Sequence, residues 1–173
     1  EFRWSPRIKR EDGLVRIVAG LGTRAVDRLS DDYPVLVSPG QPKLKINISP
    51  DELIRYSPKK IDVINLKTNE FETIPISKLI KECGDKYPEF ENVFSVMQGN
   101  MIRQPMKYEI EDSNTEYIVT FDGLINKTDF LKKVDAILKI LQTKMKTPID
   151  IEFVSNGIDF YLLQCRPQSF HGE

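Results

Sequence analysis

The chain of 173 residues carries 25 Lys and Arg against 26 Asp and Glu, for a formal net charge of -1. Its 40% hydrophobic content allows a buried core, and the charge balance argues against a nucleic-acid or anionic-membrane partner. No apolar run is long enough to cross a bilayer, no signal peptide opens the sequence, and two cysteines are too few for a disulfide framework. We therefore expect a soluble cytoplasmic protein. The single histidine, His171, argues against a Ser-His-Asp or Cys-His mechanism within the chain.

The first half of the sequence predicts β-structure separated by a loop. Breakers such as Pro34, Pro39 and Pro42 make 30–50 a long surface loop. The remaining elements are a strand at 13–20, a turn at 20–24, a short helical piece at 25–29 and a hairpin with strands at 61–66 and 70–74.

The second half predicts two helices among further strands. A short helix follows Pro75 to about Cys83, with Ser77 as its N-cap and Gly84 as its end, and an amphipathic helix capped by Thr128 covers 129–146. The predicted strands are 93–97, 117–122, 149–154 and 159–165. The mixture of helices, strands and hairpins defines an α+β fold.

The last predicted hairpin carries the polar residues of greatest interest. Asp150 and Glu152 are two apart and project from one face of their strand, as do Gln164 and Arg166 on the returning strand. A two-residue loop would set Glu152 opposite Tyr161 and send Gln164 to the other face. A three-residue loop over 156–158 would set Asp150 opposite Gln164 and gather all four polar side chains on one surface.

Such a surface suits magnesium and phosphate. Mg²⁺ commonly takes one or two carboxylates together with substrate phosphate oxygens, and an arginine can bind a phosphate through its planar fork. This combination serves phosphoryl transfer, in which catalysis is mostly positioning and charge neutralisation. The alternative is a solvated sheet face with a cross-strand salt bridge between Arg166 and an acid.

Two stretches at fixed spacing resemble a known family. Asp150-Ile151-Glu152 is followed by Phe160-Tyr-Leu-Leu-Gln164-Cys-Arg166-Pro167, so that Gln164 lies 12 residues after Glu152. This ending is similar to that of the nucleotide-binding domain of pyruvate phosphate dikinase and phosphoenolpyruvate synthase, which has an ATP-grasp fold. Three segments near the start of the chain, 3–8, 20–28 and 32–34, resemble the synthase branch of this family. Residues 56–76 and 117–125 resemble the family more loosely.

The resemblance implies a role for each polar residue of the hairpin. Glu152 would be a ligand of the ATP-bound Mg²⁺, with Gln164 beside the metal and the phosphates. Arg166 would contact the transferred phosphoryl group as the catalytic cation, and Asp150 would be a supporting acid. Arg24, where the commoner family pattern has a small or apolar residue, is either a phosphate contact or an ion-pair partner of Asp27, Asp31 or Asp32.

The resemblance also implies that 1–173 is the later part of an ATP-grasp domain. Its partners would be ATP, an upstream ATP-grasp lobe, and downstream phosphohistidine and pyruvate-binding domains, and the chain alone would not turn over. Phosphoryl transfer would run from ATP through the phosphohistidine to pyruvate. Two alternatives remain open: the same ATP-binding part serving another acceptor, such as an antibiotic or a glucan, and a non-catalytic nucleotide-sensing or interaction module.

Overall fold

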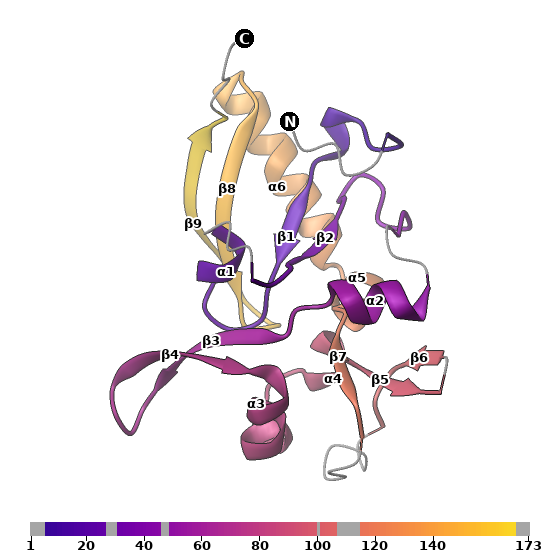
Figure 1. Cartoon of the computed structure of the whole chain (residues 1–173). Helices are drawn as coiled ribbons and strands as arrows, with labels where there is room; N and C mark the ends of the chain where they lie inside the picture. The colour runs from indigo at the N-terminus through magenta and orange to yellow at the C-terminus, as the bar shows by residue number, and fades with distance from the viewer. Residues whose placement is uncertain (1–5, 27–30, 46–48, 100, 107–114, 169–173) are drawn as a thin grey trace.

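A computed structural model describes residues 6–26, 31–45, 49–99, 101–106 and 115–168 (Figure 1). The strands are β1 (Val15–Ile17), β2 (Val35–Val37), β3 (Lys60–Asn65), β4 (Glu70–Pro75), β5 (Phe94–Gln98), β6 (Met101–Arg103), β7 (Tyr117–Val119), β8 (Ile149–Ser155) and β9 (Phe160–Pro167). The helices are α1 (Thr23–Val26), α2 (Pro50–Tyr56), α3 (Ile76–Cys83), α4 (Phe90–Val93), α5 (Asp122–Lys127) and α6 (Phe130–Met145), with 3-10 turns η1 (Arg10–Asp12) and η2 (Gly84–Lys86). The predicted α+β class is confirmed. The expectations for Asp27 and His171 lie outside the described residues.

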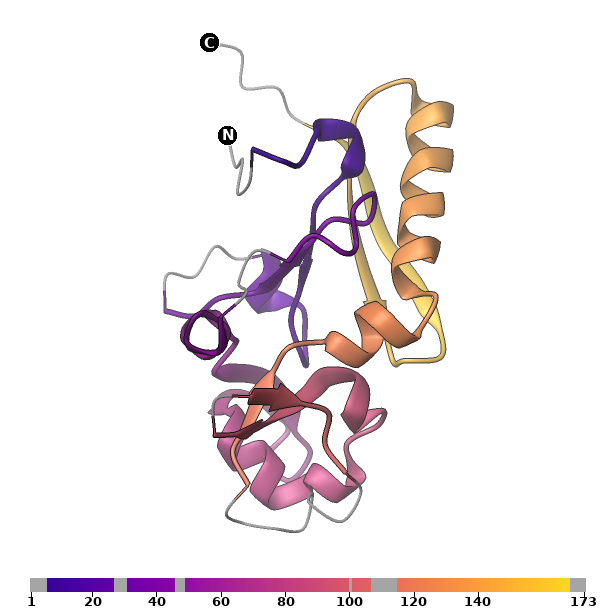
Figure 2. The same ribbon diagram turned by 90° about the vertical axis from the view of Figure 1, so that its right-hand side faces the viewer.

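The strands form small antiparallel sheets. β1 pairs with β2, β3 with β4, and β8 with β9, while β5 lies between β6 and β7. Helix α6 runs alongside the β8–β9 hairpin at one end of the molecule, and β3 to β7 with α3 and α4 form the other end (Figure 1 and Figure 2). Among the described helices, none combines the length and the hydropathy that a membrane crossing requires.

One hydrophobic cluster joins the two ends of the molecule. It contains apolar side chains from β1, β2, β3, β5 and β7 and from α3, α4 and α6, together with Ala19 and Phe121 from the connecting segments. The buried members are Val15, Ile17, Ala19, Val37, Ile61, Ile76, Phe90, Phe94, Val119, Phe121, Phe130, Leu131 and Val134. Burial of this shared apolar area is the main stabilising contribution, and it ties the β8–β9 end to the rest of the fold.

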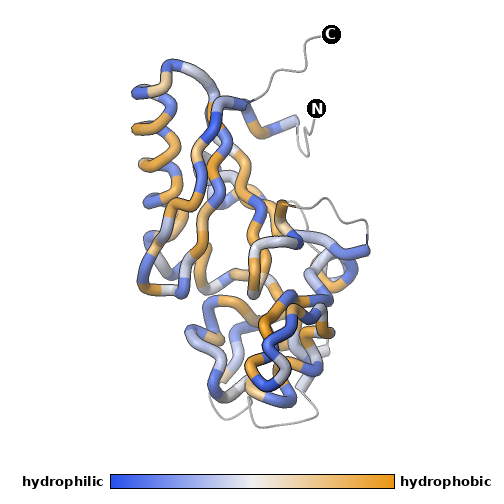
Figure 3. Tube along the Cα trace, turned by 90° about the vertical axis from the view of Figure 1, so that its left-hand side faces the viewer, coloured by the Kyte–Doolittle hydropathy of each residue, from blue (hydrophilic) through white to orange (hydrophobic). Residues whose placement is uncertain are grey.

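Helix α6 confirms the strongest prediction of the sequence. Hydrophobic and hydrophilic residues alternate along its turns (Figure 3), and Phe130, Leu131 and Val134 are buried on one face. The predicted cap is corrected: Asp129 occupies the N-cap position without a capping side-chain hydrogen bond, and Thr128 lies one residue before it, where its hydroxyl accepts a hydrogen bond from the Phe130 amide at 3.1 Å. The helix ends at Lys146, which adopts a left-handed conformation with φ of 54° before Pro148.

The β3–β4 hairpin and α3 also form close to their predicted ranges, but the predicted cap of α3 is wrong. Pro75 occupies the N-cap position, and Ser77 lies inside the helix. Helix α3 starts at Ile76 because this side chain enters the core, and a start at Ser77 would leave Ile76 outside the helix. Tertiary burial therefore outweighs the local capping preference of serine.

The predicted loop at 30–50 is corrected by the structure. Its residues 35–37 form β2, which pairs with β1, and α2 starts at Pro50 behind Ser49. Ser38 is buried, and its hydroxyl donates a hydrogen bond to the Asp12 carbonyl at 3.1 Å. Prolines flank a strand too short to show an alternating pattern, which explains why the breakers dominated the sequence signal.

Candidate functional site

The β8–β9 hairpin places the four predicted polar residues on one face. Asp150 is opposite Arg166, and Glu152 is opposite Gln164. Directly opposed residues of an antiparallel pair project to the same side, and so do residues two apart on one strand. The expected common face is thus confirmed, although both registers considered from the sequence are wrong.

The register differs because the hairpin is irregular. The pairing shifts between Glu152 and Phe153, so Leu163 has no direct partner, and Ser155 pairs with Phe160 across a four-residue loop. The Asn156 side chain shapes that loop by accepting hydrogen bonds from the amides of Ile158 and Asp159, at 3.0 and 2.7 Å. This side-chain bonding replaces a tight turn, which loop length alone could not reveal.

The opposite face of the hairpin packs on α6. Phe153 stacks on Phe160 with ring centroids 4.8 Å apart, and both rings contact Phe130 of α6. The Cys165 sulfur lies 3.5 Å from the sulfur of Met145, also on α6. Because side chains alternate along a strand, these contacts point the polar face away from the helix.

Asp150 and Arg166 form a loose, exposed ion pair. The Arg166 Nε lies 4.0 Å from the Asp150 Oδ2, and the side chains are 58% and 42% exposed. The second carboxylate oxygen of Asp150 accepts a hydrogen bond at 3.2 Å from the side-chain amide of Gln168. An exposed pair at this distance contributes little stability. Because both side chains are about half exposed, both groups remain accessible to a ligand.

Glu152 and Gln164 are directly opposed and remain available for binding. Neither side chain makes a hydrogen bond or an ion pair with another residue in the described part of the chain. Their carboxylate and amide oxygens are both hard ligands of the type that Mg²⁺ prefers. The face therefore offers adjacent oxygen ligands next to a cation.

The donor set fits a metal that shares its ligands with a substrate. Within the described ranges, no three His, Cys, Asp or Glu side chains lie close enough together to hold a metal ion by themselves. A fully protein-bound site is thus not formed by these residues. Two carboxylates and an amide fit Mg²⁺, which binds through one or two carboxylates plus phosphate oxygens of its nucleotide.

Arg24 belongs to a second cluster, built on α1 and β3. Its side chain is 6% exposed, and its Nη2 lies 2.8 Å from Asp31, its Nη1 3.4 Å from Asp62 and its Nε 3.8 Å from Asp32. Burial by itself lowers the pKa of Arg24, but the hydrogen bond and charge of Asp31, with those of Asp62, outweigh burial and raise it.

Asp62 is the buried centre of this cluster. Its carboxylate accepts hydrogen bonds from the hydroxyls of Thr23 and Thr73, the latter at 2.7 Å, as well as from Arg24. Burial by itself raises the pKa of Asp62, but these hydrogen bonds and the charge of Arg24 outweigh it and lower the pKa. The sequence analysis missed Asp62, although an acid inside the apolar run Ile61-Asp62-Val63-Ile64 is a signal for a buried partner.

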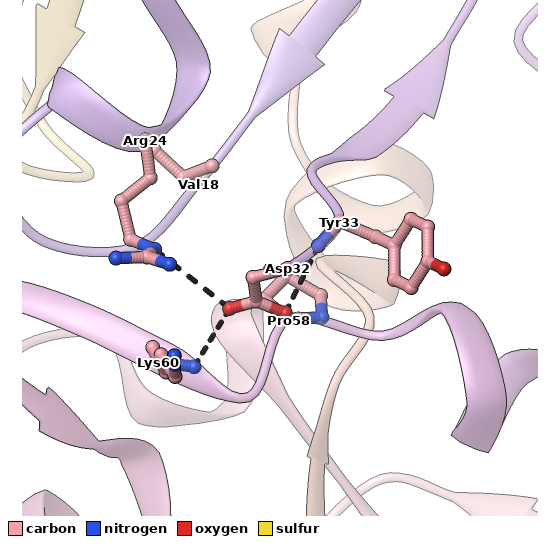
Figure 4. A pocket seen from close by; sticks show the side chains of 6 residues that line it. All are labelled: Val18, Arg24, Asp32, Tyr33, Pro58 and Lys60. Atoms are coloured by element: carbon pink, nitrogen blue, oxygen red, sulfur yellow. Dashed lines mark hydrogen bonds and ion pairs between the residues drawn. The ribbon is translucent and has the colours of Figure 1, made fainter. Parts of the chain in front are cut away.

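Asp32 completes the cluster and links its own segment to the start of β3 through backbone amides. Its carboxylate accepts hydrogen bonds from the amides of Tyr33, Lys59 and Lys60, at 2.8 to 3.0 Å. Figure 4 shows Arg24, Asp32 and Lys60 around a cavity of about 10 Å³, which Val18, Tyr33 and Pro58 also line. A cavity of this size holds one water molecule at most and cannot admit a nucleotide.

The geometry of Arg24 matches the ion-pair alternative of the sequence analysis. Its partners are Asp31 and Asp32, as considered, and additionally Asp62. None of its hydrogen bonds or ion pairs with described residues reaches the β8–β9 face. A role for Arg24 in binding phosphate stays a prediction, and the observed contacts give it a structural role.

Comparison with known proteins defines the class of the chain. A family model for the pyruvate phosphate dikinase AMP/ATP-binding domain matches residues 5–173. The chain is therefore an ATP-binding domain of the ATP-grasp type. It belongs to the pyruvate phosphate dikinase AMP/ATP-binding family. No curated protein and no solved structure matches it.

Proposed function

We propose that this chain forms the Mg²⁺- and phosphate-binding side of the ATP site in a phosphotransferase of the phosphoenolpyruvate synthase type. The observation that supports the proposal is the β8–β9 face, where Glu152 and Gln164 are directly opposed and Arg166 lies beside Asp150. An ATP-binding family supplies the ligand that such a face suits.

Each residue of the face has a distinct part in the proposal. The Glu152 carboxylate and the Gln164 amide oxygen would hold the Mg²⁺ of ATP, and the metal when bound would neutralise phosphate charge. Arg166 directs Nε toward Asp150, which leaves its two Nη groups for the phosphoryl group that is transferred. These groups would stabilise the charge that develops during transfer, and Asp150 would orient them.

The proposed route continues beyond these residues. The phosphoryl group would pass from ATP to the histidine of a phosphohistidine domain and from there to pyruvate at a pyruvate-binding domain. An upstream ATP-grasp lobe would close the other side of the nucleotide. In this account the 173 residues bind nucleotide weakly on their own, and turnover needs the remaining domains.

The proposal is tested by Glu152→Gln in the full-length protein, with Glu70→Gln as the matched control. The Glu152 side chain makes no hydrogen bond or ion pair with the described residues, so the free energy of unfolding changes by less than about 0.5 kcal/mol. The Mg²⁺ concentration that supports half-maximal ATP consumption rises about tenfold or more, because a charged ligand is lost. Glu70 is an exposed acid of β4, and its variant keeps the wild-type Mg²⁺ dependence.

Three results would revise the proposal in different ways. An unchanged Mg²⁺ dependence in Glu152→Gln contradicts the metal assignment. ATP consumption only with an acceptor other than pyruvate, such as an antibiotic or a glucan, retains the site and replaces the acceptor. ATP binding without turnover in the full-length protein favours a nucleotide-sensing module.

A further inference from the structure

Gln168 is a polar residue next to the proposed site to which the sequence analysis gave no role. It follows β9, and its backbone amide donates to the Pro148 carbonyl at 2.8 Å, which continues the hairpin ladder by one step. Its side-chain Nε2 donates to Asp150 Oδ1 at 3.2 Å, and its Oε1 accepts from Arg10 Nη2 at 3.1 Å. The side chain thus links η1 to the polar face.

The neighbours of Gln168 fix the orientation of its amide. Its donor end faces a carboxylate and its acceptor end faces a guanidinium, so a flipped amide would oppose both charges. A glutamate at this position would repel Asp150, and a leucine would bond neither neighbour. Only a side chain with one donor and one acceptor satisfies both contacts.

This link affects how Asp150 meets Arg166. A carboxylate beside a guanidinium favours a bidentate pair, in which two parallel hydrogen bonds occupy the fork of the arginine. Here Gln168 holds Oδ1, and only Oδ2 approaches Arg166, at 4.0 Å from Nε. The two Nη groups of Arg166 make no hydrogen bond or ion pair with the described residues.

We propose that Gln168 is a positioning residue for Arg166: its hydrogen bond to Oδ1 orients the Asp150 carboxylate so that only Oδ2 faces the arginine, which disfavours the closed bidentate pair and keeps the arginine fork open for a phosphoryl group. The inference rests on the proposed function, because the fork needs a substrate to bind. Gln168 itself touches no reacting atom and acts through Asp150.

The test measures steady-state kinetics of the full-length protein with ATP and pyruvate. Gln168→Leu is expected to lower kcat about tenfold, the usual scale for a supporting hydrogen bond, and to leave the KM for ATP within about twofold. Gln142→Leu is the matched control, because Gln142 is exposed on α6 and its side chain makes no hydrogen bond or ion pair with the described residues. Its kcat should equal the wild-type value.

A double-mutant cycle separates positioning from a merely structural role. In the Asp150→Asn background, Gln168→Leu should cause no further loss of kcat, because both changes act on the same contact. Additive losses, or a kcat of Gln168→Leu equal to that of Gln142→Leu, overturn the inference. If Gln168→Leu fails to fold, Gln168→Glu is measured in its place. This variant keeps an acceptor for Arg10 but repels the Asp150 carboxylate. Its kcat should fall at least as far.

Arg166→Lys distinguishes this inference from the proposed function. If Arg166→Lys abolishes turnover while Gln168→Leu behaves as the control, the inference alone fails. If Arg166→Lys keeps the wild-type kcat, the proposed function of the face fails, and the role of Gln168 fails with it.

Discussion

Asp62 shows what a single buried acid does in this fold. Its carboxylate binds Thr23, Arg24 and Thr73, and its backbone carbonyl accepts a hydrogen bond from the Leu21 amide at 3.0 Å. One residue of β3 therefore fixes the whole turn that leads into α1. The cluster resists disruption because each buried charge would lose its partner on opening.

Asp62→Asn is expected to lower the free energy of unfolding by about 2–3 kcal/mol, the range for a hydrogen-bonded charged group. The amide keeps the shape but removes the charge that compensates Arg24, and it cannot accept at both positions. Chemical denaturation monitored by circular dichroism measures the change. Asp51→Asn, an exposed acid on α2, is the control and should change stability by less than about 0.5 kcal/mol.

The stability of the wild type and that of Asp62→Asn should depend differently on pH. Hydrogen bonds and the charge of Arg24 lower the pKa of Asp62 in the folded protein below its value in the unfolded chain. Its contribution to stability is therefore complete above the unfolded pKa, near about 4, and is lost as pH falls through the folded pKa. Wild type should lose more stability than Asp62→Asn between about pH 4 and pH 2. Equal slopes would contradict a charged, paired Asp62.

At the scale of elements, the close contact between the turn at Gly20 and β3 leaves no room for a side chain at position 20. Gly20 has a φ of 78°, and a Cβ there would lie 2.4 Å from the Asp62 carbonyl oxygen and 2.6 Å from the Ile61 Cγ1. Neither the backbone of β3 nor the buried Ile61 can move away cheaply. Position 20 thus requires glycine both for its conformation and for close packing.

Gly20→Ala is expected to destabilise the fold by at least about 2 kcal/mol, from the left-handed backbone and the clash together. Gly22→Ala is the matched control in the same turn, because a Cβ there meets nothing within 4 Å and its φ is not positive. Thermal unfolding compares the two. A Gly20→Ala variant as stable as Gly22→Ala would disprove the close approach of the turn to β3.

The β8–β9 hairpin shows how far sequence reasoning reaches at this scale. Alternation along each strand predicted that Asp150 with Glu152, and Gln164 with Arg166, share a face. It could not predict the register, because the shift beside Glu152 and the loop held by Asn156 depend on packing and side-chain bonding. The common face survived because the shift compensates for the register of the four-residue loop, which by itself would set Glu152 opposite Leu163.

At the scale of the molecule, long periodic elements were predictable and short ones were not. Helix α6 carries its own amphipathic pattern, and its predicted range differs from the observed one by a single residue at each end. Strands such as β2 and β6 have three residues each and exist only because a neighbouring strand pairs with them. The surroundings of Arg24 were predictable in part: Asp31 and Asp32 were considered as its ion-pair partners, but Asp62, 38 residues away on β3, was not.

The ATP-binding character of the chain follows from its family, and the proposed location of the chemistry is the face of the β8–β9 hairpin. The central claim is that the face bearing Glu152, Gln164 and Arg166 transfers the phosphoryl group of ATP. A direct test removes the positive charge of Arg166 and leaves the fold intact. Arg166 is suitable because its exposed, loose ion pair contributes little to stability.

The decisive measurement follows ATP, Mg²⁺ and pyruvate by phosphorus NMR with the full-length protein, its Arg166→Ala variant and Arg55→Ala as an exposed-arginine control. Parallel samples with and without added inorganic phosphate are compared, and the account predicts AMP and phosphoenolpyruvate from the wild type and the control. A synthase reacts without added phosphate, because water accepts the third phosphoryl group and free phosphate is released. A dikinase reacts only with the added phosphate, which accepts that group and becomes pyrophosphate. Arg166→Ala should react at least about a thousandfold more slowly, the scale for a cation that stabilises phosphoryl transfer. If Arg166→Ala forms these products at the wild-type rate, the face does not carry the chemistry.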